Sequence, residues 1–307
     1  MNVKHAALFE LLHKSFHADI DGSMEDYRSY VDALGYITNK LHEGKVEVPH
    51  WRAYEEAQIL KFILHSSSIL QLIKGTPLKS VSTGEDVLVK DLSSILLLIR
   101  AQIENYLVLE YLTMQPKSDD EGELRFWFYE LSGLAHRQKY IAREKEFIEK
   151  KAREKQQIAA LILKILHSPL FPTLLPDLQK NLKSGKRLNK VLPSIESLIA
   201  GSSLATDLFQ SSWKLYSNYA HSELLSSMQL NGYVMNPKEQ SKMIFNAFQL
   251  STMLVCKVIK DLVALFPTSE IVYNTLPETL TTKIDFWSKA VEQKSSTTVG
   301  AQGVEAV

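Results

Sequence analysis

Hydrophobic residues recur along this chain at the three- and four-residue spacing of amphipathic helices, and clusters of glycine and proline fall between the stretches that show it. Alternation typical of strands is confined to two short stretches, 45–48 and 87–89. The pattern therefore predicts an all-α protein, built as a multi-helix bundle.

The stretch from Asp91 to Met114 has hydrophobic side chains on nearly every side of its predicted helix. A helix that is apolar all round belongs inside a protein, so we expect this one at the centre of the bundle. It also carries Arg100, Gln102 and Glu104, which are too polar for a segment that faces lipid. We therefore expect no membrane span.

From Glu123 the helical pattern continues for several dozen residues, with at most one break near Gly133. Its middle, 143–155, alternates positive and negative charges, which is typical of a solvated helix. We expect this charged helix to project from the bundle.

Breaks in the pattern divide the chain into four parts, with the clearest boundary at 75–84. We expect N-terminal helices packed on the main domain at 1–75 and the main bundle at 86–266. One or two C-terminal helices are expected at 267–293, and a disordered tail at 294–307.

Three helix limits follow from end signals. One helix is expected to begin after Ser23 with Asp26 as a capping partner, and one to run unbroken from about Ser202 to Leu230. Another starts at Asn236, followed by Pro237, and reaches about Phe266.

Charge and composition narrow the classes of function. Lys and Arg number 35, as do Asp and Glu, so no overall field attracts nucleic acid or acidic lipid. The single cysteine, Cys256, excludes an internal disulfide framework and fits a reducing cytosol. The first residues do not resemble a secretory signal, and we expect a cytoplasmic protein. Phosphate-binding glycine loops, dinucleotide fingerprints and Gly-x-Ser-x-Gly elbows are absent from the sequence, so no cofactor is predicted.

The first candidate for chemistry is Arg100 with Glu104 on the apolar helix. Residues four apart share one helical face and can form an ion pair. Two interpretations remain: an internal salt bridge that sets the packing of the helix, or a cleft arginine for a phosphate or other anion.

The second candidate is the polar segment that contains Tyr216, Asn218 and His221. A histidine with a pKa near neutrality can take the proton of a ribose 2′-hydroxyl, with the tyrosine and asparagine positioning the substrate. The alternative is a histidine that is hydrogen-bonded within the packed helices.

Two further basic or metal-binding patterns are weaker. Arg137 and Lys139 add positive charge near Arg100, or belong to a solvated face. His13 and His17 have the spacing of a metal pair, but without the Glu of a metalloprotease helix we predict no metal site.

The segments Arg100–Tyr106 and Tyr216–His221, with 123–132 between them, are similar to an uncharacterised family of bacterial helical proteins. That family distantly resembles the HEPN superfamily (higher eukaryotes and prokaryotes nucleotide-binding), whose members are helical bundles, often dimeric. Many are metal-independent RNases of toxin and phage-defence systems. The resemblance makes His221 the counterpart of their catalytic histidine.

The usual asparagine and arginine of that superfamily lie four and five residues before the histidine, where this chain has Ser217 and Tyr216. Either Arg100 replaces that arginine from another helix, or the site does not cut RNA. The first hypothesis is thus a protein directed to RNA or a nucleotide, with His221, Arg100 and Glu104 as catalytic residues that meet in one protomer or across a homodimer. The alternative is a non-catalytic scaffold in which these three side chains form a structural core network.

Overall fold

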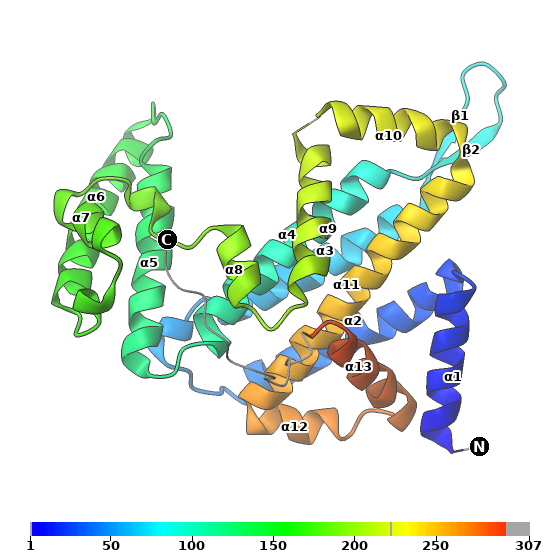
Figure 1. Ribbon diagram of the computed structural model, residues 1–307, viewed down its shortest axis with the longest axis horizontal. Helices are drawn as coiled ribbons and strands as arrows, with labels where there is room; N and C mark the ends of the chain where they lie inside the picture. Colours follow the sequence, from blue (N-terminus) through cyan, green and yellow to red (C-terminus); the bar gives the residue numbers. More distant parts are fainter. Residues whose placement is uncertain (1, 222, 293–307) are drawn as a thin grey trace, which may run out of the picture.

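The computed structural model describes residues 2–221 and 223–292; the expected disordered tail, 294–307, lies outside them. Within this range the chain forms thirteen α-helices and one two-stranded hairpin (Figure 1). The predicted all-α class is therefore confirmed, as is the long apolar helix.

The apolar helix α4 (Leu92–Leu109) lies at the centre of the larger of two hydrophobic clusters. Helices that pack around it or on its neighbours come from both ends of the chain. They are α2 (Ile20–Glu43), α3 (Glu55–Lys74), α9 (Thr206–Ala220) and α11 (Pro237–Leu265). In α4, Ile95, Ile99 and Ile103 are fully buried. Leu97, 36% exposed, is the one exposed apolar residue of this helix, so its position is central.

Shorter helices complete this part of the molecule, which we call the body. They are α1 (Val3–Phe16), α8 (Ile195–Gly201), α10 (Leu224–Met235), α12 (Pro267–Tyr273) and α13 (Glu278–Ala290). Tight turns of helix occur at His50–Arg52 (η1), Glu110–Met114 (η2, a π-helical turn), Phe171–Thr173 (η3) and Leu188–Lys190 (η4).

A hydrogen-bonded polar group crosses the core of the body. Gln102 donates to Ser66 Oγ over 2.8 Å and accepts from Ser251 Oγ over 2.6 Å, and Ser251 lies 2.7 Å from the Tyr27 hydroxyl. These four residues belong to α4, α3, α11 and α2 and are fully buried. Because a buried amide must find its partners, this group favours one mutual arrangement of four helices.

The expected break at 75–84 is part of a β-hairpin. Strands β1 (Thr76–Lys79) and β2 (Asp86–Val89) pair antiparallel, with Thr76 opposite Val89. Gly75 and Gly84 have φ angles of +83° and +74°, which side chains rarely adopt. The strand expected at 87–89 is thus present, whereas 45–48 is a loop.

One of the helices predicted from end signals differs from the expectation in its limits, and another agrees with it. Helix α2 begins four residues earlier than expected, because Asp19 caps it by accepting from the Gly22 amide. Asp26 instead forms ion pairs with Lys14 and Lys283, at 3.0 and 2.8 Å. The helix that starts at Pro237 runs to Leu265, close to the expected end.

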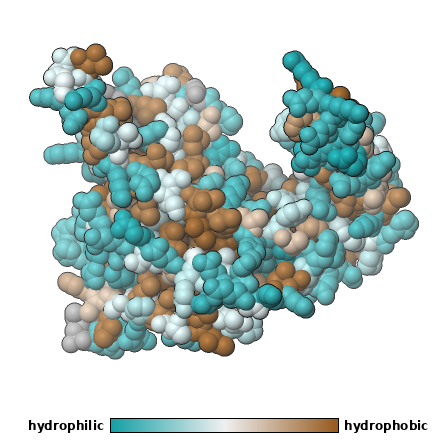
Figure 2. All heavy atoms as spheres, turned by 180° about the vertical axis from the view of Figure 1, so that it is seen from behind, coloured by the Kyte–Doolittle hydropathy of each residue, from teal (hydrophilic) through white to brown (hydrophobic). Residues whose placement is uncertain are grey.

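A smaller hydrophobic cluster is made by residues 119–192, which we call the lobe. It contains α5 (Asp119–Arg137), α6 (Lys145–His167) and α7 (Pro176–Ser184), which group at one side of the molecule (Figure 1). The helical stretch predicted after Glu123 had at most one break, near Gly133; the structure continues the helix through Gly133 and places the break at 138–144, in a loop that separates α5 from α6. Figure 2 shows the lobe as a largely hydrophilic projection beside a hollow.

The expected main domain, 86–266, thus contributes to both clusters, and its limits stay a prediction. Contact between lobe and body centres on Trp51, whose Nε1 donates to Asp119 over 3.2 Å. A Cβ atom on Gly122 would lie 2.5 Å from the Trp51 indole, so the glycine permits this close approach. Tyr54 stacks on Phe126, with ring centroids 5.7 Å apart.

The helix expected from Ser202 to Leu230 is in fact two helices. Helix α9 ends at Ala220, His221 follows as its C-terminal cap, and α10 begins at Leu224. The Glu223 amide closes the break by donating to the Asn218 carbonyl over 3.2 Å. Glu223 itself is extended, with ψ at 158°, which a continuous helix excludes.

Leu92–Met114, which is α4 with the following π-helical turn, is long and apolar enough to cross a membrane by length and composition. More than half of this segment is buried inside the protein. Burial is what the central helix of a bundle requires, so the segment is only weak support for a membrane span.

Candidate functional site

Arg100 and Glu104 form an ion pair on α4, as their spacing predicted. The Arg100 Nε donates to Glu104 Oε1 over 2.9 Å. The same oxygen accepts from Trp213 Nε1 of α9, also over 2.9 Å, and the guanidinium lies 5.6 Å from the Trp213 ring centroid. The arginine and the glutamate side chains are 20% and 35% exposed. The two charges are therefore engaged in joining α4 to α9.

His221 lies on the same helix as Trp213, eight residues further along. Eight residues of α-helix advance about 12 Å, so the imidazole is two turns away from the indole that Arg100 contacts. The His221 side chain is exposed. Within one chain the arginine and the histidine are held apart, with the guanidinium directed to Glu104 and Trp213 rather than to the histidine.

Tyr216 and Asn218 are positioned by the packing of α9. Tyr216 is 5% exposed within the main cluster, and burial raises its pKa to about 12. It is therefore a core residue, and its expected contact with substrate stays a prediction. Asn218 is half-buried, and its carbonyl closes the turn before α10.

We expect His221→Ala to change the free energy of unfolding by less than about 0.5 kcal/mol, because the side chain is exposed and alanine keeps the backbone amide that caps α9. Urea unfolding measures this change. Loss of RNA-cutting activity in this variant, with the free energy of unfolding unchanged, would support a catalytic role. The scaffold hypothesis places His221 in a core network and therefore requires that the substitution destabilise the protein.

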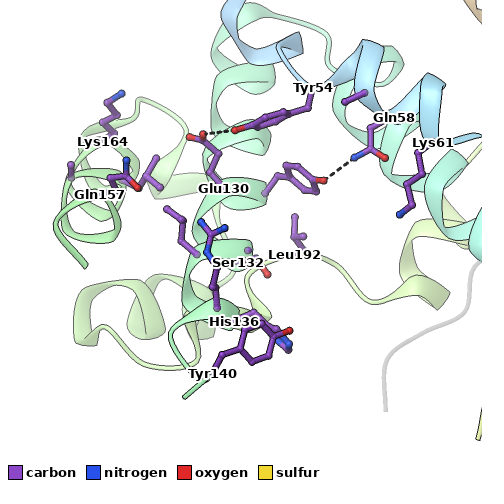
Figure 3. A pocket seen from close by; sticks show the side chains of 17 residues that line it. Tyr54, Gln58, Lys61, Glu130, Ser132, His136, Tyr140, Gln157, Lys164 and Leu192 are labelled. Carbon is purple, nitrogen blue, oxygen red and sulfur yellow. Dashed lines mark hydrogen bonds between the residues drawn. The ribbon is translucent and has the colours of Figure 1, made fainter. Parts of the chain in front are cut away.

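An open cleft of about 1100 Å³ lies between the lobe and the body (Figure 3). Its walls come from α3, α5, α6 and the segments after α5 and before α8. Three of the lining residues are tyrosines and four are basic, and these seven are Tyr54, Tyr129, Tyr140, Lys61, His136, Arg137 and Lys164.

Two hydrogen bonds cross the cleft from α3 and the turn before it to α5. Gln58 Nε2 donates to the Tyr129 hydroxyl over 2.8 Å, and the Tyr54 hydroxyl lies 3.5 Å from Glu130 Oε1 (Figure 3). Gln58 is in turn anchored to α4, since Asn105 donates to its carbonyl over 2.8 Å. Burial and then the Glu130 charge raise the pKa of Tyr54, so this phenol stays neutral at physiological pH.

The basic side chains approach the cleft from both parts of the molecule. Lys61 belongs to α3 of the body, whereas Lys164 belongs to α6 of the lobe, and both are exposed. Arg137 lies 2.8 Å from Glu154 of α6, which balances part of its charge. The His136 and Tyr140 rings meet edge to face, with centroids 5.7 Å apart.

Of the predicted basic pair, Arg137 lines the cleft, whereas Lys139 is exposed in the loop after α5 and is not among the lining residues. Sequence reasoning missed Tyr54, Lys61, Glu130 and Lys164. The signal that indicates them is the run of aromatic residues at 126–129, in which alternate side chains pack into the protein and the others are partly exposed.

The His13 and His17 rings lie 4.3 Å apart on the exposed side of α1. Across residues 2–221 and 223–292 the structure contains no group of three or more His, Cys, Asp or Glu side chains placed to hold a metal ion. The pair therefore lacks the further ligands that a metal site needs.

No protein-family model, curated protein or solved structure matches this chain significantly. The resemblance to HEPN proteins consequently stays a prediction.

Proposed function

We propose that this protein binds a nucleotide, free or as part of single-stranded RNA, in the cleft between lobe and body. The observation that supports this proposal is the composition of the cleft. Among its described lining residues are three tyrosines, two lysines and one arginine, but one carboxylate, Glu130. Aromatic rings stack on bases, and lysine or arginine binds phosphate, so these two residue types together suit a nucleotide.

Binding in this cleft differs from the catalytic arrangement that the resemblance implies. Arg100 is engaged with Glu104 and Trp213, about 12 Å along α9 from His221. A single chain therefore offers no phosphate clamp beside the histidine. Three separate hypotheses remain beside this proposal. They are metal-independent RNA cleavage with His221 as acid or base, assembly as a homodimer, and a role in a toxin or phage-defence system.

We expect Lys61→Glu with Lys164→Glu to weaken nucleotide binding at least tenfold, because two attractive charges become repulsive in the cleft. Isothermal titration calorimetry with 5′-mononucleotides and with a ten-nucleotide RNA measures the effect and distinguishes the two forms of ligand. Affinity for the RNA is expected to fall as salt is raised.

Lys238→Glu with Lys289→Glu is the matched control, since both lysines are exposed, on α11 and α13, and neither lines the cleft. It makes the same charge change elsewhere and is expected to leave affinity unchanged. Equal loss in the cleft variant and the control would show that only net charge matters. If the wild-type protein binds neither ligand, the proposal is wrong.

A further inference from the structure

Tyr54 presents a stacking surface at the wall of the cleft. Phe126 covers one face of its ring, with centroids 5.7 Å apart and planes inclined by 26°. Tyr129 meets the ring edge-on at 6.1 Å. Tyr54 is nevertheless 44% exposed and lines the cleft, into which its ring projects (Figure 3). The face opposite Phe126 is thus available to a planar ligand.

Glu130 lies beside this surface. Its Oε1 is 3.5 Å from the Tyr54 hydroxyl, at the edge of the ring (Figure 3). Among the residues that line the cleft in the described part of the chain, it is the only carboxylate. A planar ligand stacked on Tyr54 therefore has one edge directed toward two acceptor oxygens that carry a negative charge.

We propose that the cleft selects guanine, and that Glu130 is the residue that determines this specificity. The inference rests on the proposed nucleotide-binding function. Guanine has two adjacent donors, N1–H and the 2-amino group, on its Watson–Crick edge, and a carboxylate can accept both at once. Adenine, cytosine and uracil each place an acceptor next to a single donor there. An acceptor that faces a carboxylate is repelled, so these bases are disfavoured as well as less well bound.

The basic side chains of the cleft are suitably placed for the phosphate of a guanine nucleotide. Lys61 and Lys164 approach the cleft from opposite walls (Figure 3). Arg137 lies on the same helix as Glu130, two turns further along. Seven residues of helix correspond to about 10 Å, which is comparable with the span from a base edge to the 5′-phosphate. The base and the phosphate therefore have separate partners.

Calorimetric titration of the full chain with 5′-GMP, 5′-IMP, 5′-AMP, 5′-CMP and 5′-UMP tests this inference. IMP keeps N1–H but lacks the 2-amino group. We expect GMP to bind about tenfold or more tightly than the other four, in keeping with the value of one bidentate base contact. Glu130→Gln is expected to bring GMP and AMP to similar affinities, because it weakens the contact to guanine and relieves the repulsion of adenine.

Glu123→Gln is the matched control, because it removes the same charge from α5 outside the cleft. It should leave the GMP preference intact. Tyr54→Leu should weaken all five nucleotides alike by removing the stacking surface, whereas Glu130→Gln should alter only the preference.

Three outcomes separate the two proposals. Equal binding of all five nucleotides, unchanged by Glu130→Gln, overturns the guanine inference and leaves nucleotide binding in place. Binding of none overturns both. If GMP is preferred but Glu130→Gln keeps that preference while the variant unfolds at the wild-type temperature, Glu130 is not the residue responsible and the inference is also overturned.

Discussion

Arg52→Leu is expected to lower the free energy of unfolding by about 3 kcal/mol, because it leaves a buried carboxylate without its partner. The Arg52 Nε and NH2 groups donate to Glu55 Oε2 and Oε1 over 2.7 and 3.0 Å. The arginine and the glutamate are only 9% and 5% exposed. The guanidinium also lies 4.6 Å from the Phe266 ring centroid, so its loss removes packing as well. Urea unfolding measures the change.

Glu55→Leu and the double variant complete a thermodynamic cycle with this substitution. Glu55→Leu alone should destabilise by a similar amount, since it leaves the guanidinium buried and unpaired. The double variant should be more stable than either single one, because no unpaired charge remains. If the two single effects simply add in the double variant, the pair does not act as a unit.

Gly122→Ala is expected to destabilise the protein by about 1–3 kcal/mol, although alanine normally favours a helix over glycine. The new Cβ would lie 2.5 Å from two carbons of the Trp51 indole. The indole has little room to move, because it is buried and its Nε1 is hydrogen-bonded to Asp119. We therefore expect the contact between lobe and body to open, and nucleotide binding in the cleft to weaken with it.

Gly133→Ala is the matched control, on the same helix. A Cβ at this position meets no atom within 4 Å, so only the backbone effect remains. It should stabilise the protein by about 0.5–1 kcal/mol. Thermal unfolding followed by circular dichroism compares the two variants. Equal stabilisation by both would show that Trp51 and Gly122 are not tightly packed.

Most helices and the central position of α4 could be predicted, because hydrophobic spacing reports which side of a helix is buried. The Arg100–Glu104 pair followed from the same local geometry. The break at His221 could not be predicted in this way. Residues 202–230 keep helical spacing throughout, yet the extended backbone of Glu223 separates α10 from α9. The loop at 138–144, between two stretches with helical patterns, was missed for the same reason.

By itself the sequence determined the all-helical class, the central helix and the identity of residues able to carry charge on it. Only the tertiary structure decided which of these residues meet. Tyr54 and Lys61 come from one end of α3, Glu130 and Arg137 from α5, and Lys164 from α6. The cleft therefore unites residues that are far apart in the sequence. Periodicity encodes which face of a helix is buried, but not which partner buries it. The packing of Trp51 on Gly122 places the lobe and thereby creates the cleft.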